Sequence, residues 1–189
     1  MFNSVTDVSV LSEKGADMFG KIKSLRELFE IELGYAYDCE KKLVEKGLPG
    51  MIENASSSEL RSALEQHLEE TRGHVTRLVR VFATLGVEPK AQSNAVIGDF
   101  TSAAKDSASH IEDSPLRDAA LIVNGNFVEH YEIALYGSLA AFAKSLGLSE
   151  AAQLLNETLA EEKAANAKLS QIGESLLGVQ SGKTQAAAR

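Results

Sequence analysis

The feature that most constrains this chain is a pair of similar segments in its two halves, each with carboxylates where a helix should be apolar. The first segment spans residues 67–78 and the second spans residues 158–169. When the two are aligned, Glu70 falls on Glu161. A buried carboxylate costs free energy unless it is paired or bound to a metal ion. The repeat therefore predicts a carboxylate-rich metal site inside a helical bundle.

Apolar residues recur at helical spacing in four long stretches. In the second stretch the predicted core stripe runs from Leu60 to Leu85, and in the third it includes Leu116, Val123, Phe127 and His130. The second stretch opens with Ser56 and Glu59, the spacing of a capping box. The third opens with Ser114 as N-cap and Pro115 at the first helical position. Glycines mark the end of each stretch. The pattern predicts four helices, over about residues 21–47, 56–86, 114–147 and 149–178.

A long connection, residues 87–113, separates the second predicted helix from the third. It is too long for a tight turn, and its apolar residues predict a short extra helix lying across the bundle. Short links within each helix pair and one long crossover are typical of a ferritin-like four-helix bundle. We therefore predict an all-α fold with the bundle at residues 21–177, a flexible arm at residues 1–20 and a disordered tail at residues 178–189.

Charge and cysteine content exclude several classes of function. The formal net charge of −8 argues against nucleic acid as a partner. The single cysteine, Cys39, excludes an intramolecular disulfide and a cysteine-held zinc or iron–sulfur site, and its position indicates a small core residue. The chain shows neither a signal peptide nor a stretch long enough to span a membrane, so we expect a cytoplasmic protein.

Each predicted helix carries candidate metal ligands near its middle. A dinuclear iron or manganese site takes about four to six oxygen and nitrogen ligands from all four helices, and the carboxylates among them offset the charge of the ions. Iron is the expected metal, with manganese as the other candidate. The candidate ligands, in chain order, are Glu40, His67, Glu70, His74, Glu129, His130, Glu132, Glu161 and Glu162.

The segments that contain these residues resemble the YciE/YciF family of ferritin-like bacterial stress proteins, which are often described as candidate ferroxidases. The resemblance covers about Leu25 to Ile172. It implies a dimer and a metal centre of the rubrerythrin type, and it implies no established substrate. The segments that carry it are Tyr37–Leu43, His67–Thr71, Arg117–Ile122, Glu129–Gly137 and Glu157–Ala164.

The resemblance also implies roles for individual ligands. Glu40 matches the ligand of the first helix, Glu70 and Glu161 match those of the second and fourth, and Glu129 with Glu132 resembles the paired carboxylates of the third. The glutamates of the second and fourth helices are not followed three residues later by the usual histidine. Three alternatives stay open: an asymmetric dinuclear site, a mononuclear site with histidines and carboxylates, and no metal.

Glu161 and Glu162 are adjacent, so they cannot both face the bundle axis. The helical stripe favours Glu162, whereas the alignment with Glu70 favours Glu161. We prefer Glu161 and keep Glu162 as the alternate ligand.

The expected function is oxidation of ferrous iron or consumption of peroxide, with metal ions and a small oxidant, oxygen or peroxide, as partners. The alternative is a non-enzymatic helical stress protein, a dimer that acts by binding a partner or by sequestering ions. Sequence does not separate ferroxidase from peroxidase or catalase activity, because that choice depends on access to the site.

Overall fold

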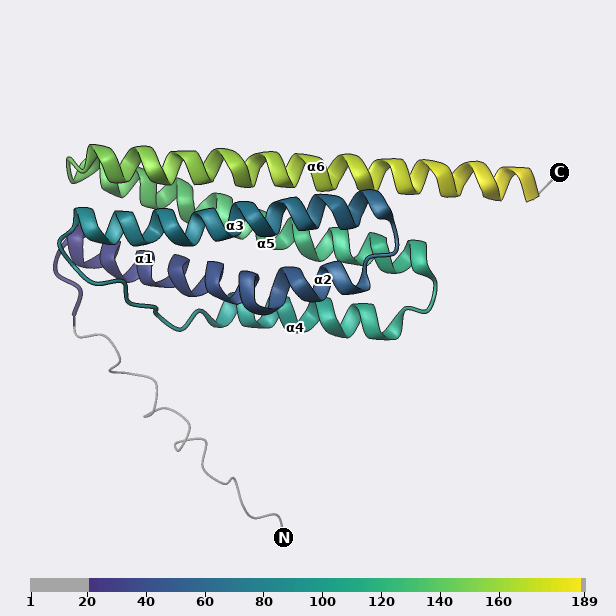
Figure 1. Ribbon diagram of the computed structural model, residues 1–189, viewed down its shortest axis with the longest axis horizontal. Coiled ribbons are helices and arrows are strands. Elements are labelled where there is room, and N and C mark those ends of the chain that lie inside the picture. The colour runs from purple at the N-terminus through teal and green to yellow at the C-terminus, as the bar shows by residue number, and fades with distance from the viewer. Residues whose placement is uncertain (1–20, 188–189) are drawn as a thin grey trace, which may run out of the picture.

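The computed structural model describes the backbone of residues 21–187 and the side chains through residue 176. Within this range every regular element is helical (Figure 1). The arm predicted at residues 1–20 lies outside the described residues. The elements in chain order are α1 (Leu25–Lys42), a π-helical turn η1 (Leu43–Gly47), α2 (Leu48–Asn54), α3 (Ser58–Thr84), α4 (Ala95–His110), α5 (Ser114–Ser145) and α6 (Ser149–Ala187).

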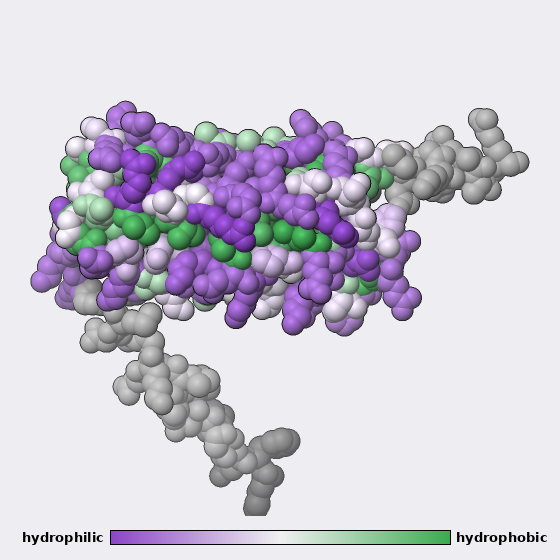
Figure 2. All heavy atoms as spheres, in the orientation of Figure 1, coloured by the Kyte–Doolittle hydropathy of each residue, from purple (hydrophilic) through white to green (hydrophobic). Residues whose placement is uncertain are grey.

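Four helical rods lie side by side along one axis, which confirms the predicted four-helix bundle. Figure 1 shows α1 and α2 forming one rod, with α3, α5 and α6 as the others. The extra helix predicted in the crossover is α4, but it runs along the bundle rather than across it (Figure 1). On the face shown in Figure 2, a row of apolar side chains is bordered by hydrophilic ones, as amphipathic helices require.

The apolar core consists of two separate clusters, one toward each end of the bundle. One contains Phe29 and Leu78, and the other contains Leu43 and Leu64. In α3 the apolar residues of the two clusters are separated by buried polar residues, and α6 repeats this order. A polar layer therefore divides the core at mid-length.

The first helix continues past the predicted stop, so the end expected at residues 47–50 is wrong. In η1 the N–H of Leu48 donates to the carbonyl of Leu43, one residue further back than in an α-helix. This shift lets a new helix, α2, begin with Pro49 in its first turn. Proline is tolerated there because the first turn has no use for its missing N–H.

The ends of α3 and α5 lie within two residues of the predicted ones, whereas α1 begins at Leu25, four residues after the predicted start. The N-cap of α3 is Ser57 rather than Ser56, and that of α5 is Asp113 rather than Ser114. Gly86 and Gly147 follow α3 and α5 with φ values of 71° and 73°. Only glycine adopts this left-handed conformation without strain, so both glycines end their helices as predicted.

The core-facing side of α5 differs from the predicted one. The stripe read from the sequence, which includes Leu116, Val123 and Phe127, faces outward, with exposed fractions of 59, 52 and 53 %. The core side instead carries Leu121, Leu139 and the polar residues described below. Because α5 is apolar on both sides, periodicity alone does not identify its buried face.

Helix α6 is longer than predicted. Its backbone continues to Ala187, past Gly178, and extends beyond the end of the other helices (Figure 1). The disordered tail expected from residue 178 therefore differs from the structure, which gives residues 178–187 a helical backbone. Gly178 is not among the glycines with positive φ, so it does not end the helix.

The crossover is attached closely to α1. Gln92 donates its N–H to the carbonyl of Gly34 at 2.9 Å, and a Cβ atom at Gly34 would lie 2.8 Å from the carbonyl oxygen of Lys90. Only glycine permits this approach. The N–H of Asn94 donates to Asp38 at 2.8 Å. None of the described helices is long and apolar enough to cross a membrane.

We predict that Asp118 is essential for the junction between α2 and α3. Its buried carboxylate accepts the N–H groups of Ser56 and Ser57, each at 2.7 Å. Asp118→Ala leaves both donors without a partner and should lower the free energy of unfolding by about 2–4 kcal/mol. Urea unfolding without added metal measures this effect. The exposed control Glu112→Ala should stay within about 0.5 kcal/mol of wild type, and an equally small change in Asp118→Ala would refute the assignment.

Candidate metal centre

Six ionisable side chains from all four rods meet in the polar layer. Each is at most 6 % exposed, which is unusual for glutamate and histidine. Glu40 comes from α1, His67 and His74 from α3, Glu129 and Glu132 from α5, and Glu162 from α6. They lie at the same height along the bundle axis, because each is on the buried side of its helix between the two apolar clusters.

These side chains form two groups of possible metal ligands that share one glutamate. The first group contains Glu40, His74 and Glu162, and the second contains His67, Glu129, Glu132 and Glu162. Within each group, one ligand atom from every residue lies within 4.8 Å of the others. Glu162 therefore connects two neighbouring positions for a cation.

The histidines lie against the carboxylates. His67 Nε2 lies 3.2 Å from Glu129 Oε1 and 3.7 Å from Glu162 Oε2. His74 Nδ1 lies 2.9 Å from Glu162 Oε1 and 3.5 Å from Glu40 Oε1. One oxygen of Glu162 thus faces each histidine.

Several of these atoms are buried without a hydrogen-bond partner. They are Glu40 Oε2, His74 Nδ1, Glu129 Oε2, Glu132 Oε2 and both carboxylate oxygens of Glu162. His74 Nδ1 and Glu162 Oε1 are close, but their directions do not make a hydrogen bond. A buried polar atom without a partner costs about 1–3 kcal/mol, and a cation bound at this position would offset that cost for several atoms at once.

Divalent cations fit this donor set. The four buried glutamates, when ionised, carry four negative charges, which equals the charge of two divalent ions. Carboxylates with imidazoles are ligands that iron, manganese and zinc accept. The unpartnered atoms are of the kind that could act as donors to such ions.

Neighbouring residues fix the orientation of the candidate ligands. Glu161 accepts a hydrogen bond from His74 Nε2 at 2.8 Å, and Arg77 binds both carboxylate oxygens of Glu161. This arrangement leaves His74 Nδ1 directed toward the site. Tyr136 donates to Glu40 Oε1. Carboxylate contacts of this kind commonly orient a metal-binding histidine.

Six of the nine candidate residues come together, and three do not. Glu162 is buried and belongs to both groups, whereas the side chain of Glu161 is 34 % exposed and belongs to neither, so the structure favours the alternate candidate Glu162 over the preferred Glu161. His130 is exposed on the outer side of α5 and belongs to neither group. The side chain of Glu70 is 32 % exposed, and its Oε2 lies 3.4 Å from His67 Nδ1 at the edge of the site.

Sequence reasoning missed the contact between Cys39 and Glu132. The thiol donates to Glu132 Oε1 at 3.5 Å, which leaves Oε2 as the unpartnered oxygen. Cys39 directly precedes Glu40, but the sequence indicates only a small core residue, because a helix pattern does not show which neighbour a thiol meets.

Burial and mutual repulsion dominate the protonation of this layer. Burial raises the pKa of Glu132 well above its usual value, and the other carboxylates add to the shift. Burial likewise raises the pKa of Glu162 to about 7, although His74 opposes the change. Burial lowers the pKa of His74, but Glu162 and Glu40 outweigh it and raise the value to about 10. Without metal, the layer therefore retains protons.

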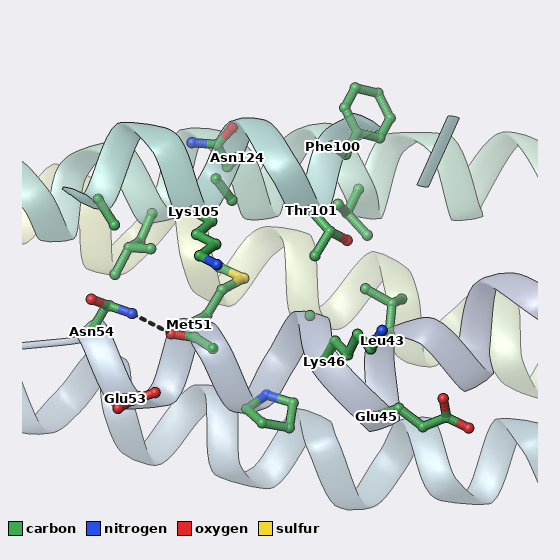
Figure 3. Close-up of a pocket in the computed structure, with 17 residues that line it drawn as sticks. Leu43, Glu45, Lys46, Met51, Glu53, Asn54, Phe100, Thr101, Lys105 and Asn124 are labelled. Carbon is green, nitrogen blue, oxygen red and sulfur yellow. Dashed lines mark hydrogen bonds between the residues drawn. The ribbon is translucent and has the colours of Figure 1, made fainter. Parts of the chain in front are cut away.

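Two cavities flank this part of the bundle. A cavity of about 240 Å³ lies between α3 and α6 and reaches His67 and Glu129. A larger one, of about 460 Å³, is lined by η1, α2, α4 and α5 (Figure 3). None of the six buried ligand candidates lines the larger cavity, and its Asn54 side chain bonds the carbonyl of Gly50 in its own helix (Figure 3).

We predict opposite effects of pH on stability and on metal binding. The folded-state pKa values of Glu162 and His74 exceed their unfolded values, so the metal-free native state holds more protons and its stability falls as pH rises. A cation competes with those protons and binds more tightly at higher pH. Between about pH 5 and about pH 8, the Tm without metal should fall while the Tm increase caused by Mn²⁺ grows.

Thermal melts of wild type and Glu162→Gln measure both trends. Glutamine cannot titrate, so the variant should show a smaller loss of Tm with pH and little response to Mn²⁺. A Mn²⁺-induced increase that shrinks as pH rises would contradict the assignment.

Comparison with known proteins agrees with the helical-bundle fold. The family described as "Domain of unknown function (DUF892)" matches residues 24–181. The protein YciF of Escherichia coli (strain K12) is 36 % identical over 152 residues, which cover 80 % of this chain and 91 % of YciF. Its crystal structure, that of a stress protein, matches with a TM-score of 0.80 and 35 % identity and covers 83 % of this chain and 99 % of its own.

Two further solved structures are similar. YcfI from Rhodopseudomonas palustris, described as a candidate structural protein, has a TM-score of 0.77 and 40 % identity, covering 79 % of this chain and 94 % of its own. A protein of Xanthomonas campestris pv. campestris has a TM-score of 0.64 at 24 % identity, covers 86 % of this chain and 99 % of its own, and shows the fold alone. The chain therefore belongs to the DUF892 family and is a relative of the stress protein YciF.

Proposed function

We propose that this chain is a cytoplasmic di-metal protein of the stress response that oxidises ferrous iron or consumes peroxide. The observation that carries the proposal is the pair of buried ligand groups that share Glu162. A single polar layer held by ion pairs has no need for a carboxylate that faces two histidines at once, with neither oxygen hydrogen-bonded.

In this proposal one ion is held by Glu40, His74 and Glu162, and the other by His67, Glu129, Glu132 and Glu162. Two ferrous ions held by these residues would supply the two electrons that reduction of peroxide to water requires. Manganese accepts the same ligands and is the second candidate. The pairing of one glutamate with both ions keeps them adjacent.

The surrounding residues maintain this arrangement. The Arg77–Glu161 pair holds the His74 ring in one orientation, and Tyr136 fixes one oxygen of Glu40. The apolar clusters on either side exclude water, so the carboxylates act in a medium of low dielectric constant. Charge interactions are strongest in such a medium, which favours tight binding of cations.

A purely structural role for the polar layer is the competing proposal, and the description of YcfI as a candidate structural protein supports it. In that case the histidines and glutamates pair with one another, and the protein acts by binding a partner or by sequestering ions. The two proposals predict different metal contents for the protein after loading.

We predict that the adjacent glutamates of α6 differ sharply in their effect on metal loading. After anaerobic loading with Fe²⁺ and removal of free metal, wild type should hold about two ions per chain by elemental mass spectrometry. Glu162→Gln removes the ligand common to both groups and should hold close to none. Glu161→Gln should keep the stoichiometry, with affinity weakened by about 10- to 100-fold.

The exposed residue Glu69 supplies a further control, since Glu69→Gln should load like wild type. Failure of wild type to retain Fe²⁺ would refute the metal proposal and favour the structural one. If the loaded protein then oxidises added Fe²⁺ or removes peroxide, the proposed activity is supported.

We also propose that two copies of the chain pair through the outer side of α5. Leu116, Val123 and Phe127 form an exposed apolar row about 16 Å long. Single exposed apolar residues are common on protein surfaces, whereas a continuous apolar row of this kind is typical of an interaction site. Ala134 and Ala141 continue the row with small side chains, so that a second α5 can approach closely. A row of this kind is complementary to itself when two copies lie antiparallel.

The expected result is a dimer for wild type and a monomer for Val123→Glu in sedimentation equilibrium. The charge has no partner in the apolar interface, whereas it is solvated in the single chain. Glu112→Gln, an exposed control, should remain dimeric. A monomeric wild type would refute the pairing.

A further inference from the structure

The smaller cavity connects the surface to one of the two ligand groups. It lies between α3 and α6, and two of its lining residues, His67 and Glu129, belong to the second group. Neither cavity is lined by Glu40, His74 or Glu162, which are fully buried. Among the described residues, the second ligand group is thus the one that an incoming solute reaches first.

Glu129, which lines this cavity, carries a buried oxygen without a partner. Glu129 is 3 % exposed, and its Oε2 has no hydrogen-bond partner. Its other oxygen is 3.2 Å from His67 Nε2. A carboxylate oxygen of this kind is a ready ligand for a cation that arrives through the cavity.

A second carboxylate stands at the outer end. Glu70 is about one-third exposed, and its Oε2 lies 3.4 Å from His67 Nδ1 while Gln66 donates to its other oxygen at 2.8 Å. Lys168 also lines the cavity, but its ammonium group pairs with Glu59 at 3.1 Å. Glu70 and Glu129 therefore contact the same imidazole from the outer and inner sides.

The cavity is open because its walls carry small side chains. Ala63 on α3 and Ala165 on α6 are half-buried in the two walls. Ala164 also lines it, and this is the position three residues after Glu161 where the usual motif has histidine. The missing histidine therefore leaves space at this point.

We propose that the cavity between α3 and α6 is the access route for divalent cations, and that Glu70 receives each ion and passes it to Glu129 and His67. This proposal rests on the metal binding proposed above and adds the path and the residue that controls the rate. Glu70 is exposed enough to meet a hydrated cation and close enough to the site to release it there. Glu162 belongs to both groups, so an ion can pass through it to the fully buried group of Glu40 and His74.

Binding kinetics test this route separately from binding itself. The chain has no tryptophan and four tyrosines, and Tyr136 contacts the ligand Glu40, so quenching of tyrosine fluorescence by Co²⁺ reports uptake. Stopped-flow mixing of the full chain with Co²⁺ gives the association rate, and elemental analysis after equilibration gives the stoichiometry. Both are readouts that require no oxidation chemistry.

The route is closed from either wall by Ala63→Leu or Ala165→Leu. Each should slow association by about tenfold or more, with the final stoichiometry unchanged. Ala160→Leu, on the exposed side of α6, is the matched control and should associate like wild type. Because two different walls are altered, misfolding of one variant, seen by circular dichroism, does not remove the test.

The role of the outer carboxylate is tested by Glu70→Gln. Loss of its charge should slow association by about tenfold at low salt and reduce the dependence of the rate on salt. Glu69→Gln, next to it but paired with Arg72 on the exposed surface, should change neither.

The outcomes separate the two proposals. Wild-type rates in both leucine variants and in Glu70→Gln, with normal loading, would overturn the access route while leaving the metal site intact. Loss of stoichiometry in Glu70→Gln would make Glu70 a resident ligand and overturn its transfer role. No Co²⁺ uptake by wild type would overturn the metal site and the route together.

Discussion

The burial of four glutamates in the middle of an apolar bundle is the constraint on which the rest of this structure depends. Ionised carboxylates so close together repel one another, and desolvation adds to the cost. Two histidines offset only part of this, because six nitrogen and oxygen atoms of the layer keep no hydrogen-bond partner. The apolar clusters at both ends supply the stability that allows such a layer to exist. The proposed pair of divalent cations would supply both the missing charge and the missing partners.

Several irregular features of the fold lie close to this layer. The π-helical turn η1 begins three residues after Glu40 and changes the register of the first rod. Such turns are frequent next to functional sites. The crossover is held to α1 by Gly34 and Asp38, on the side of the rod that does not carry the ligand. The long crossover and α4 thus cover the bundle without obstructing the cavity between α3 and α6.

Sequence spacing predicts most of the fold, and six of the nine residues that it offers as ligands lie together in the polar layer. The α3 stripe predicted from Leu60 to Leu85 is buried, and it places His67 and His74 correctly. The stripe of α6 indicated Glu162, but the alignment of the two halves outweighed it and gave Glu161. The two aligned glutamates do occupy similar positions, because each contacts a histidine of α3 from the outer side: Glu161 contacts His74, and Glu70 contacts His67.

The remaining differences have physical causes that spacing does not reveal. Helix α5 is apolar on both sides, so spacing alone assigns its outer row, which includes His130, to the core. The contacts of Cys39 with Glu132 and of Tyr136 with Glu40 join residues far apart in the sequence. Such contacts depend on how the helices are rotated against each other, which becomes fixed only when all four pack.

Anomalous X-ray diffraction from crystals loaded with Fe²⁺ shows whether two cations share Glu162. We expect two anomalous peaks per chain, about 3.5–4 Å apart, with one oxygen of Glu162 bound to each ion and Glu161 bound to neither. A single peak, peaks that lie outside the polar layer, or ions bound by Glu161 instead of Glu162 would contradict this expectation.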